Sequence, residues 1–369
     1  MLKSTPPMGW NSWNTFGENI SDRLIRETAD IMADEGYLDA GYDYLVIDDC
    51  WSLRQRDETG RLVADPAKFP NGMKDLADYV HSKGLKFGMY SCAGVRTCAG
   101  YPGSYGHEFE DARTFAEWGV DFLKYDYCFK PWEATGEVLY RRMGLALRAS
   151  GRDILFSACN WGSDDSGRWM RSAGAHMYRS TGDIVDSYQS FTDIAASQAD
   201  KLGFGAPNCF NDLDMLIVGM YGKGNVGVAG CTDAEYRSHF AQWCFFNSPL
   251  MIGCDLRNVN TESAQLLKNK ELIAINQDPE VRPPYKFGNA YFKHLADGSY
   301  VLGVFNPYES ESRQYLLFAD AGLPVNCGYG FRLRDIFTGE DCGVYTDDFF
   351  VDIPARDCKV YRVTVERVK

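Results

Sequence analysis

The feature that most constrains the fold is an alternation, repeated along the chain, of short apolar runs and stretches with helical periodicity. Strands that alternate with helices in this way form βα units and pair in parallel. Most of the runs start roughly 30 to 40 residues apart, the length that one βα unit needs. Eight strands are expected, at MGWNSW (8–13), YDYLVIDD (42–49), LKFGMYS (85–91), DFLKYD (121–126), ILFSACN (154–160), HMYRSTGD (176–183), CFNDLDML (209–216) and PLMIGCDL (249–256).

Eight βα units within about 280 residues predict an α/β fold, the (β/α)8 or TIM barrel. The alternative is a doubly wound open sheet, which usually carries a glycine-rich phosphate turn, G-x-G-x-x-G, after its first strand. The first run is instead followed by NSWNTFGEN, which lacks that pattern. The barrel is therefore the preferred fold.

The pattern changes after about residue 280. The stretch PEVRPPYKFG (279–288) is typical of a proline-rich hinge, and beyond it short alternating runs are separated by turn sequences such as ADGS and TGED. Short strands with little helix between them predict an antiparallel β-sandwich. We expect the barrel over residues 1–282 and the C-terminal antiparallel β-sandwich over residues 283–369.

Charge and hydropathy limit the kinds of partner. The chain has 51 acidic and 38 basic residues, a net charge of −13, whereas nucleic acids and anionic membranes require basic patches. No run of 18 apolar residues is present, so no membrane span is expected. Aromatic residues make up 14% of the chain, which indicates either a large aromatic core or a cleft that suits sugars. We expect a small-molecule partner and leave self-association open.

The twelve cysteines are spread over 369 residues without a repeated spacing. Several of them, such as Cys244 and Cys254, lie within apolar runs, which favours buried free thiols in a reducing compartment. No C-x-x-C pair is present, so a structural zinc site is not expected. The N-terminal stretch MLKSTPPMGW has no apolar signal region, and we therefore expect a cytoplasmic protein.

Polar side chains stand at the ends of the predicted strands, where barrels carry their chemistry. One aspartate at a strand end is usually a helix cap or a turn residue. Aspartates at five of eight ends predict a shared site, because so many like charges need common donors, cations or ligands. The residues are Asp48, Asp49, Tyr90, Asp126, Asn160, Asp183, Asp212, Asp214 and Asp255.

Known cofactor patterns do not explain this ring of carboxylates. The chain has five histidines but no H-x-H or H-E-x-x-H pattern, so transition-metal chemistry is not expected, although Mg²⁺ on paired aspartates stays open. No phosphate loop or nucleophile elbow occurs, and GNVGVAG (224–230) is interpreted as a plain loop. We expect no metal and no cofactor. A pair of carboxylates for acid and base work, with others that bind hydroxyls, is typical of a glycosidase.

Lys124 and Asp126 are two residues apart on one predicted strand, so their side chains share a face. In a barrel mouth Lys124 would lower the pKa of Asp126 and keep it ionised, as a nucleophile requires. The alternative is an internal ion pair that only neutralises a buried charge. Asp183 is the candidate proton donor, because neighbouring aspartates would raise its pKa. Asp186 is the rival, although its position favours a helix cap.

Several long stretches, in order, resemble one known enzyme family. The resemblance covers most of the chain, from about residue 5 to 280, and fits the sandwich after that. These stretches are similar to glycoside hydrolase family 27, which comprises α-galactosidases and α-N-acetylgalactosaminidases. They are MGWNSW (8–13), IDDCW (47–51), GRLVADPAKFPNGMKDLADYVHSKGLKFGMY (60–90), TCAGYPGS (97–104), FAEWGVDFLKYDYC (115–128), RSTGDI (179–184), NDLDML (211–216) and FFNSPLMIGCDL (245–256).

The resemblance implies a barrel with a C-terminal sandwich and a retaining double displacement without a metal. KYDYC matches the family pattern K-[YF]-D-x-C, which implies that Asp126 is the nucleophile. RSTGD matches R-x-x-x-D, which implies that Asp183 is the acid/base. The residues implied to contact the sugar are Trp13, Asp48, Asp49, Tyr90, Lys124, Asn160, Trp161, Arg179 and Asp214.

The chain also departs from the family pattern. Cys98 and Cys128 match a disulfide of the family, whereas Cys50 and Cys159 lack the partners that the family has. Asn160 replaces the glutamate of the family's C-E-W motif, which contacts the sugar 2-hydroxyl. Relatives that act on N-acetylgalactosamine have small residues at that position.

We expect an exo-acting α-galactosidase that releases terminal α-linked galactose from small oligosaccharides. The alternatives are an α-N-acetylgalactosaminidase or a β-L-arabinopyranosidase on the same scaffold, and retention of Asp48 and Asp49 argues against the latter. Two alternatives of another class are a non-catalytic sugar-binding protein and a Mg²⁺-dependent enolising barrel.

Overall fold

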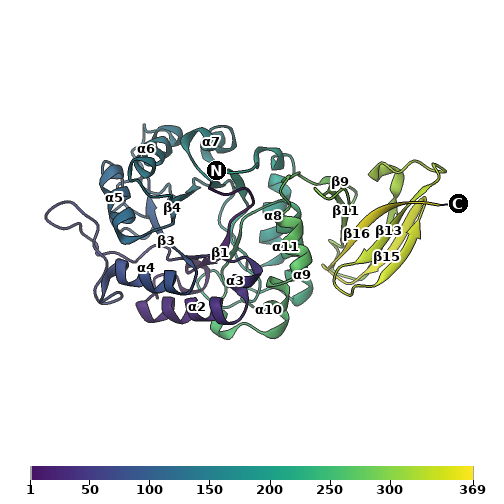
Figure 1. Ribbon diagram of the computed structural model, residues 1–369, viewed down its shortest axis with the longest axis horizontal. Coiled ribbons are helices and arrows are strands. Elements are labelled where there is room, and N and C mark those ends of the chain that lie inside the picture. Colours follow the sequence, from purple (N-terminus) through teal and green to yellow (C-terminus); the bar gives the residue numbers. More distant parts are fainter. Residues whose placement is uncertain (1, 369) are drawn as a thin grey trace.

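The computed structural model describes residues 2–368, which form two lobes joined side by side (Figure 1). The larger lobe contains eight strands, one in each of the eight runs expected from the sequence, and the third extends one residue beyond its run, to Cys92. They are β1 (Met8–Asn11), β2 (Tyr44–Val46), β3 (Lys86–Cys92), β4 (Phe122–Asp126), β5 (Leu155–Cys159), β6 (Met177–Arg179), β7 (Phe210–Asp212) and β8 (Leu250–Ile252).

These strands form one parallel sheet in the order β7-β6-β5-β4-β3-β2-β1-β8. Because β7 and β8 are its edges, the sheet curls until they meet, and a parallel bridge pairs Leu216 with Ile252. The backbone of Leu216 donates to Met251 O at 2.7 Å and accepts from Gly253 N at 3.0 Å. The sheet is thus a barrel, and the doubly wound alternative is excluded.

Helices surround the barrel, and their ends follow local sequence signals. The helix α9 begins with a capping box in which Thr232 and Glu235 exchange hydrogen bonds. The helix α5 ends at Gly119, whose φ of 84° favours glycine. The helices are α1 (Trp13–Phe16), α2 (Asp22–Asp34), α3 (Tyr37–Ala40), α4 (Gly72–Ser82), α5 (Glu108–Trp118), α6 (Gly136–Ala149), α7 (Met170–Ala173), α8 (Tyr188–Gln198), α9 (Asp233–Phe245), α10 (Thr261–Leu267) and α11 (Lys270–Asn276).

The barrel interior is closed below the strand ends by a layer of large apolar side chains. At Gly88, on β3, an added Cβ would lie 2.6 Å from the Val46 side chain, so only glycine leaves room for this layer. These packed side chains fill the barrel interior, so that it is closed at this level and is not a pore. The layer consists of Tyr44, Val46, Phe122, Leu155, Met177, Phe210 and Met251.

The second lobe is an antiparallel sandwich, as expected. A six-stranded sheet, in the order β14-β13-β16-β11-β10-β9, packs against the two-stranded sheet β12-β15. The proline-rich stretch expected to be a hinge also contributes the strand β9. The strands are β9 (Tyr285–Phe287), β10 (Ala290–His294), β11 (Tyr300–Phe305), β12 (Ser312–Leu317), β13 (Tyr329–Asp335), β14 (Asp341–Tyr345), β15 (Asp348–Ile353) and β16 (Cys358–Arg367).

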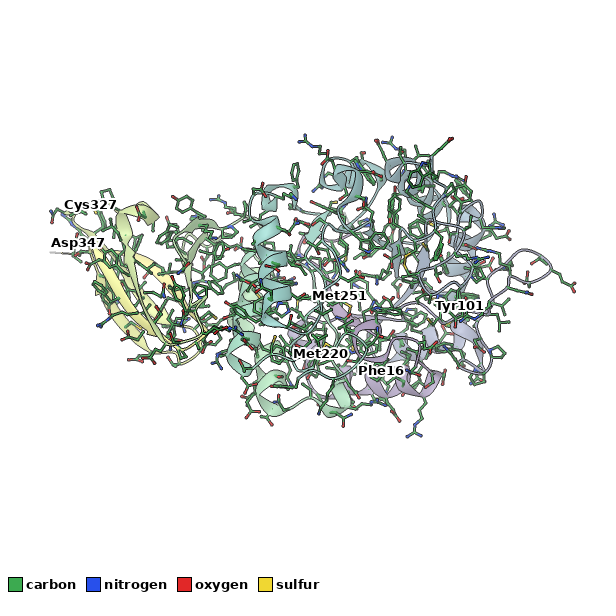
Figure 2. The ribbon with its side chains drawn as sticks, turned by 180° about the vertical axis from the view of Figure 1, so that it is seen from behind. Phe16, Tyr101, Met220, Met251, Cys327 and Asp347 are labelled. Atoms are coloured by element: carbon green, nitrogen blue, oxygen red, sulfur yellow. A yellow bond between two sulfur atoms is a disulfide. The ribbon has the colours of Figure 1, made fainter. Side chains whose placement is uncertain are left out.

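The sandwich packs beside α8, α9 and α11 of the barrel (Figure 1). Arg237 on α9 donates to Asp357 with its Nε at 3.0 Å, and Ser238 donates to Arg356 O at 2.8 Å. Cys327 and Asp347 lie at the end of the sandwich away from the barrel, whereas Met251 lies within the barrel lobe (Figure 2). Within residues 2–368, none of the helices combines the length and the apolar character that a membrane span requires.

Candidate active site

The carboxyl ends of the barrel strands surround a cavity of about 320 Å³ above the apolar floor. Most of the site residues expected from the sequence line it, although they come from different βα units. The expected residues on its wall are Trp13, Asp48, Asp49, Tyr90, Cys98, Lys124, Asp126, Trp161, Arg179, Asp183 and Asp214.

Lys124 lies between two carboxylates. Its Nζ donates to Asp48 Oδ2 at 2.9 Å and lies 3.9 Å from Asp126 Oδ2. Asp48 Oδ2 also accepts from Asn11 Nδ2 at 2.8 Å, which holds this carboxylate in place. Burial by itself would lower the pKa of Lys124, but the charges of Asp48 and Asp126 raise it, so the lysine is a cation. The arrangement places one fixed positive charge among the acidic groups.

The pKa of Asp126 moves in the direction opposite to the one expected. Its side chain is buried, and burial raises the pKa above the usual value, while the nearby Lys124 lowers it by less. The expected direction took account of the charge of Lys124 but not of how deeply the Asp126 carboxyl group is buried. Among the described residues, Asp126 Oδ1 has no hydrogen-bond partner. This oxygen is itself buried, although the residue as a whole lies on the cavity wall.

Asp183 also differs from its expected electrostatics. It lies in the loop after β6, its side chain is 72% exposed, and its Oδ1 accepts from Arg179 Nη2 at 2.7 Å. Partial desolvation raises the pKa of Asp183, but the Arg179 charge outweighs it and the net pKa is lowered. The expectation that neighbouring aspartates raise this pKa is wrong, because the nearest charged group is a cation.

Arg179 joins two sides of the site. Its Nη1 lies 2.8 Å from Asp214 Oδ1, opposite the bond from Nη2 to Asp183. Asp214 is held by Ile184 N, which donates to Oδ2 at 2.7 Å, and it adopts a φ of 87°. Such a backbone conformation costs a non-glycine residue about 1–3 kcal/mol and is concentrated at functional sites. The strain indicates that this side chain is placed for a purpose other than stability.

Asp49 and Tyr90 form the side of the cavity next to the only disulfide among the described residues. Asp49 Oδ2 accepts from Ala99 N at 2.9 Å, and the Tyr90 hydroxyl lies 3.4 Å from Cys98 Sγ. Cys98 is bonded to Cys128, with 5.2 Å between their Cα atoms. The bond connects the loop after β3 to the end of the strand that carries Asp126, so it holds the wall beside the nucleophile candidate.

Asn160 is not on the cavity wall, contrary to the expected sugar contact. It is fully buried, and its Nδ2 donates to Ser163 O at 2.7 Å. That bond closes the turn after β5, where the next residue, Trp161, has a φ of 56° and faces the cavity. The residue that replaces the expected glutamate thus shapes the loop that carries Trp161. Cys50 and Cys159, the other two departures, are buried free thiols.

Part of the wall comes from the glycine-rich segment of residues 224–230. Asn225, Val226, Gly227 and Val228 line the cavity, and their segment was interpreted as a plain loop. Asp186, the rival acid candidate, is fully buried and accepts from Gly222 N at 2.6 Å, so it holds this loop. Its many glycines indicated close backbone contacts, but the sequence pattern does not show which segments of the chain make these contacts.

Within residues 2–368, no group of three or more histidine, cysteine, aspartate or glutamate side chains is arranged to hold a metal ion. Lys124 and Arg179 instead offset part of the negative charge of the cavity through ion pairs with its carboxylates. The site therefore contains two cations, several carboxylates with oriented oxygens, and the aromatic faces of Trp13 and Trp161. A sugar has hydroxyls that exchange hydrogen bonds with charged side chains, and an apolar ring face that packs on aromatic side chains. The site offers both kinds of group.

Comparisons with known proteins agree with this chemistry. The family model described as alpha galactosidase A matches residues 5–278, and that of the alpha galactosidase C-terminal beta sandwich domain matches residues 289–363. The α-galactosidase of Coffea arabica is 49% identical over 369 residues, which cover 98% of this chain and 94% of that protein. The α-galactosidase 3 of Arabidopsis thaliana is 49% identical over 380 residues, covering 100% of this chain and 83% of that protein.

A solved structure extends the similarity to the whole fold. The α-galactosidase I from Mortierella vinacea matches with a TM-score of 0.92 and 33% identity, covering 100% of this chain and 99% of that one. Both lobes and the order of the motifs are therefore those expected from the resemblance. The chain belongs to the α-galactosidase family of glycoside hydrolases, family 27.

Proposed function

We propose that the protein is a retaining, exo-acting α-galactosidase that releases terminal α-linked galactose from oligosaccharides. The observation that carries the proposal is the presence of Asp126 and Asp183 in one blind cavity with hydroxyl-binding groups around them. Because apolar side chains close its floor, a chain of sugars can enter only by its end. The names of the related proteins support galactose as the terminal sugar.

In the first step, the Asp126 carboxylate attacks the anomeric carbon of the bound galactose. The bond from that carbon to the glycosidic oxygen breaks as the bond to Asp126 forms, and Asp183 gives its proton to the departing oxygen. In the second step, Asp183 takes a proton from water, and the water oxygen bonds to the anomeric carbon. The electron pair of the ester bond returns to Asp126, and galactose leaves with its original anomeric configuration.

The pKa of Asp183 must rise before the first step and fall before the second. In the open cavity Arg179 keeps it low. A sugar that fills the cavity removes water from Asp183, which raises its pKa while Asp126 is still an anion. Formation of the glycosyl-enzyme removes the charge of Asp126, so the pKa of Asp183 falls again and the residue can act as a base.

The remaining polar groups recognise the sugar. Asp48 and Asp49 accept hydrogen bonds from its hydroxyls, Lys124 donates to one of them, and Trp13 covers an apolar face. Asp214 and Arg179 bind at the other side of the ring. Asn160 is given no contact with the sugar 2-hydroxyl, because its side chain is fully buried behind the cavity wall.

The test is a panel of aryl glycosides: the α-galactoside, the α-N-acetylgalactosaminide and the β-L-arabinopyranoside. We expect the wild type to prefer the α-galactoside, and Asp126→Asn to lose at least about 1,000-fold in kcat while it still binds galactose. Equal hydrolysis by the wild type and Asp126→Asn would remove the proposed nucleophile. Binding without turnover in the wild type would instead favour a sugar-binding protein, and a loss of activity in EDTA would favour the magnesium-dependent alternative.

We also propose that the protein acts in the cytoplasm. Ten cysteines form no disulfide, and eight of them are buried, as is usual for proteins of reducing compartments. Thiol labelling of the denatured protein, isolated with and without reductant, counts the free thiols and checks this proposal.

A further inference from the structure

Two aromatic side chains are exposed in the loop that follows β4. Phe129 is 58% exposed and Trp132 is 94% exposed, and both come within six residues of Asp126. The carboxyl end of β4 faces the cavity, so this loop begins at the catalytic end of the barrel. Scattered apolar side chains on a surface need no explanation, but two aromatics in one loop beside a sugar site do.

The backbone of Phe129 is held in an unfavourable conformation. Its φ is 49°, in the left-handed region that a bulky side chain rarely adopts. Val95 N donates to Phe129 O at 3.1 Å and ties the residue to the loop after β3. At Gly94 an added Cβ would lie 2.0 Å from Cys128 O, so only glycine lets the two loops meet. The disulfide between Cys98 and Cys128 joins the same two loops.

The second half of the loop is fixed against the cavity wall. Lys130 Nζ donates to Trp132 O at 3.2 Å and to Ala134 O at 2.9 Å. The same ammonium lies 5.3 Å from the centre of the Tyr127 ring, and that ring lies 6.3 Å from the ring of Trp161. Since Trp161 lines the cavity, contacts run without a break from the wall to the backbone of Trp132.

The structure thus maintains a strained backbone, a glycine contact and a disulfide around Phe129, whose side chain is more than half exposed. Strain of this kind persists where function requires it. The cavity is lined by many charged groups, whereas the neighbouring loop after β4 exposes two aromatic side chains. A substrate that spans the two would place a polar ring in the cavity and a second ring outside it.

We propose that Phe129 and Trp132 bind the leaving-group sugar of an oligosaccharide α-galactoside. The proposal rests on the proposed function, because the blind cavity takes the terminal galactose and the rest of the substrate must lie at its mouth. The carbon–hydrogen faces of a pyranose pack on aromatic rings, while its hydroxyls stay in water. The two side chains contribute to the choice of substrate and take no part in bond making.

The test compares a substrate that has a sugar leaving group with one that lacks it. Raffinose carries a disaccharide leaving group, and α-galactosyl fluoride releases only fluoride. We expect Phe129→Gly and Trp132→Ala each to lower kcat/KM for raffinose by roughly three- to tenfold, mainly through KM, and to leave α-galactosyl fluoride unchanged. Glycine is chosen at position 129 because it adopts a φ of 49° without strain.

Two controls separate recognition from folding. Phe129→Tyr keeps the ring and should retain activity on raffinose. Tyr315→Ala removes a 55% exposed aromatic side chain from the sandwich and should leave kcat/KM unchanged for both substrates. A second measurement determines the affinity for raffinose and for galactose when Phe129→Gly or Trp132→Ala is combined with Asp126→Asn. Weaker binding of raffinose alone supports the proposal.

Equal losses on both substrates, or no loss on either, would overturn the proposed aromatic subsite while the wild type stays an active α-galactosidase. Failure of the wild type on both substrates would instead overturn the proposed function, and the leaving-group assignment with it. The two failures are therefore distinguished by the wild-type measurement alone.

Discussion

At the residue scale, Lys124 determines the charge of the site. It is the cation that lies within 4 Å of both Asp48 and Asp126, at 2.9 and 3.9 Å. Without it, burial of Asp126 would be opposed only by weaker hydrogen bonds. The ionised fraction of Asp126, the proposed nucleophile, at a given pH thus depends strongly on this side chain.

Lys124→Met should shift the acidic limb of the pH profile of kcat/KM to higher pH, by about one unit or more. Lys124 lowers the pKa of Asp126, so its loss raises that pKa, and the ionised nucleophile then forms only at higher pH. Profiles of wild type and variant between pH 3 and 8 provide the measurement, with Lys74→Met, at an exposed lysine on α4, as the matched control outside the cavity. An unshifted limb would mean that Lys124 contributes only substrate contacts.

The position of Asp126 and Asp183 at one cavity was predictable from the sequence, but the electrostatics of the two carboxylates were not. Asp126 and Asp183 stand at or just beyond strand ends in recognisable motifs. Their pKa directions depend on depth below the surface and on distance to Arg179, and neither quantity is encoded in local pattern. For the same reason Asn160 was predicted on the wall and lies behind it.

At the element scale, the loop of residues 222–230 depends on Asp186. This aspartate accepts from Gly222 N at 2.6 Å and from the Tyr236 hydroxyl at 3.0 Å, and its backbone oxygen accepts from Gly230 N at 3.0 Å. The far side of the loop pairs with α1, where Val226 N donates to Asn14 O at 3.0 Å. The loop therefore presents Asn225 to Val228 to the cavity in one conformation.

Asp186→Ala should loosen this loop, because Gly222 N and the Tyr236 hydroxyl lose their acceptor, at a cost of about 1–3 kcal/mol. We expect faster amide hydrogen exchange at residues 222–230 and a higher KM, with little change in the melting temperature of the barrel. Asp193→Ala, an exposed aspartate on α8, is the control. Unchanged exchange in this loop would contradict the role given to Asp186.

The eight barrel strands were predicted correctly, including those of only three residues, whereas β9 of the sandwich was not. The eight barrel strands were found because buried parallel strands are continuous apolar runs. The strand β9 was interpreted as part of a hinge because Pro283 and Pro284 precede it directly, yet an edge strand tolerates that composition.

At the scale of the whole molecule, one buried lysine joins the two lobes. Lys293, on β10 of the sandwich, is 1% exposed, and its Nζ donates to Asn247 Oδ1 at 2.9 Å and to Ile275 O at 3.0 Å. Ile275 is near the end of α11, where backbone carbonyls carry partial negative charge. Burial nevertheless lowers the pKa of Lys293 to about 7.

The free energy of unfolding of the wild type, relative to Lys293→Met, should increase as pH rises from about 7 toward 10. In this range the unfolded lysine holds a proton that the folded one has lost, so the slope is about 1.4 kcal/mol per pH unit. Urea unfolding of both proteins at pH 7, 8 and 9 measures the difference. Lys286→Met, an exposed lysine of β9, is the control, and a flat difference for Lys293→Met would show that the buried group stays charged.

The sequence by itself determined the barrel, the sandwich and the family, because these depend on periodicity, strand-end residues and motif order, which are local properties of the chain. Only the tertiary structure decided which groups meet in the cavity: that Asp183 pairs with Arg179, that Asn160 lies behind Trp161, and that the loop of residues 222–230 completes the wall. The physical reason is that the burial of a side chain and its distance to charged groups depend on segments far apart in the sequence. These segments come together only when the barrel closes.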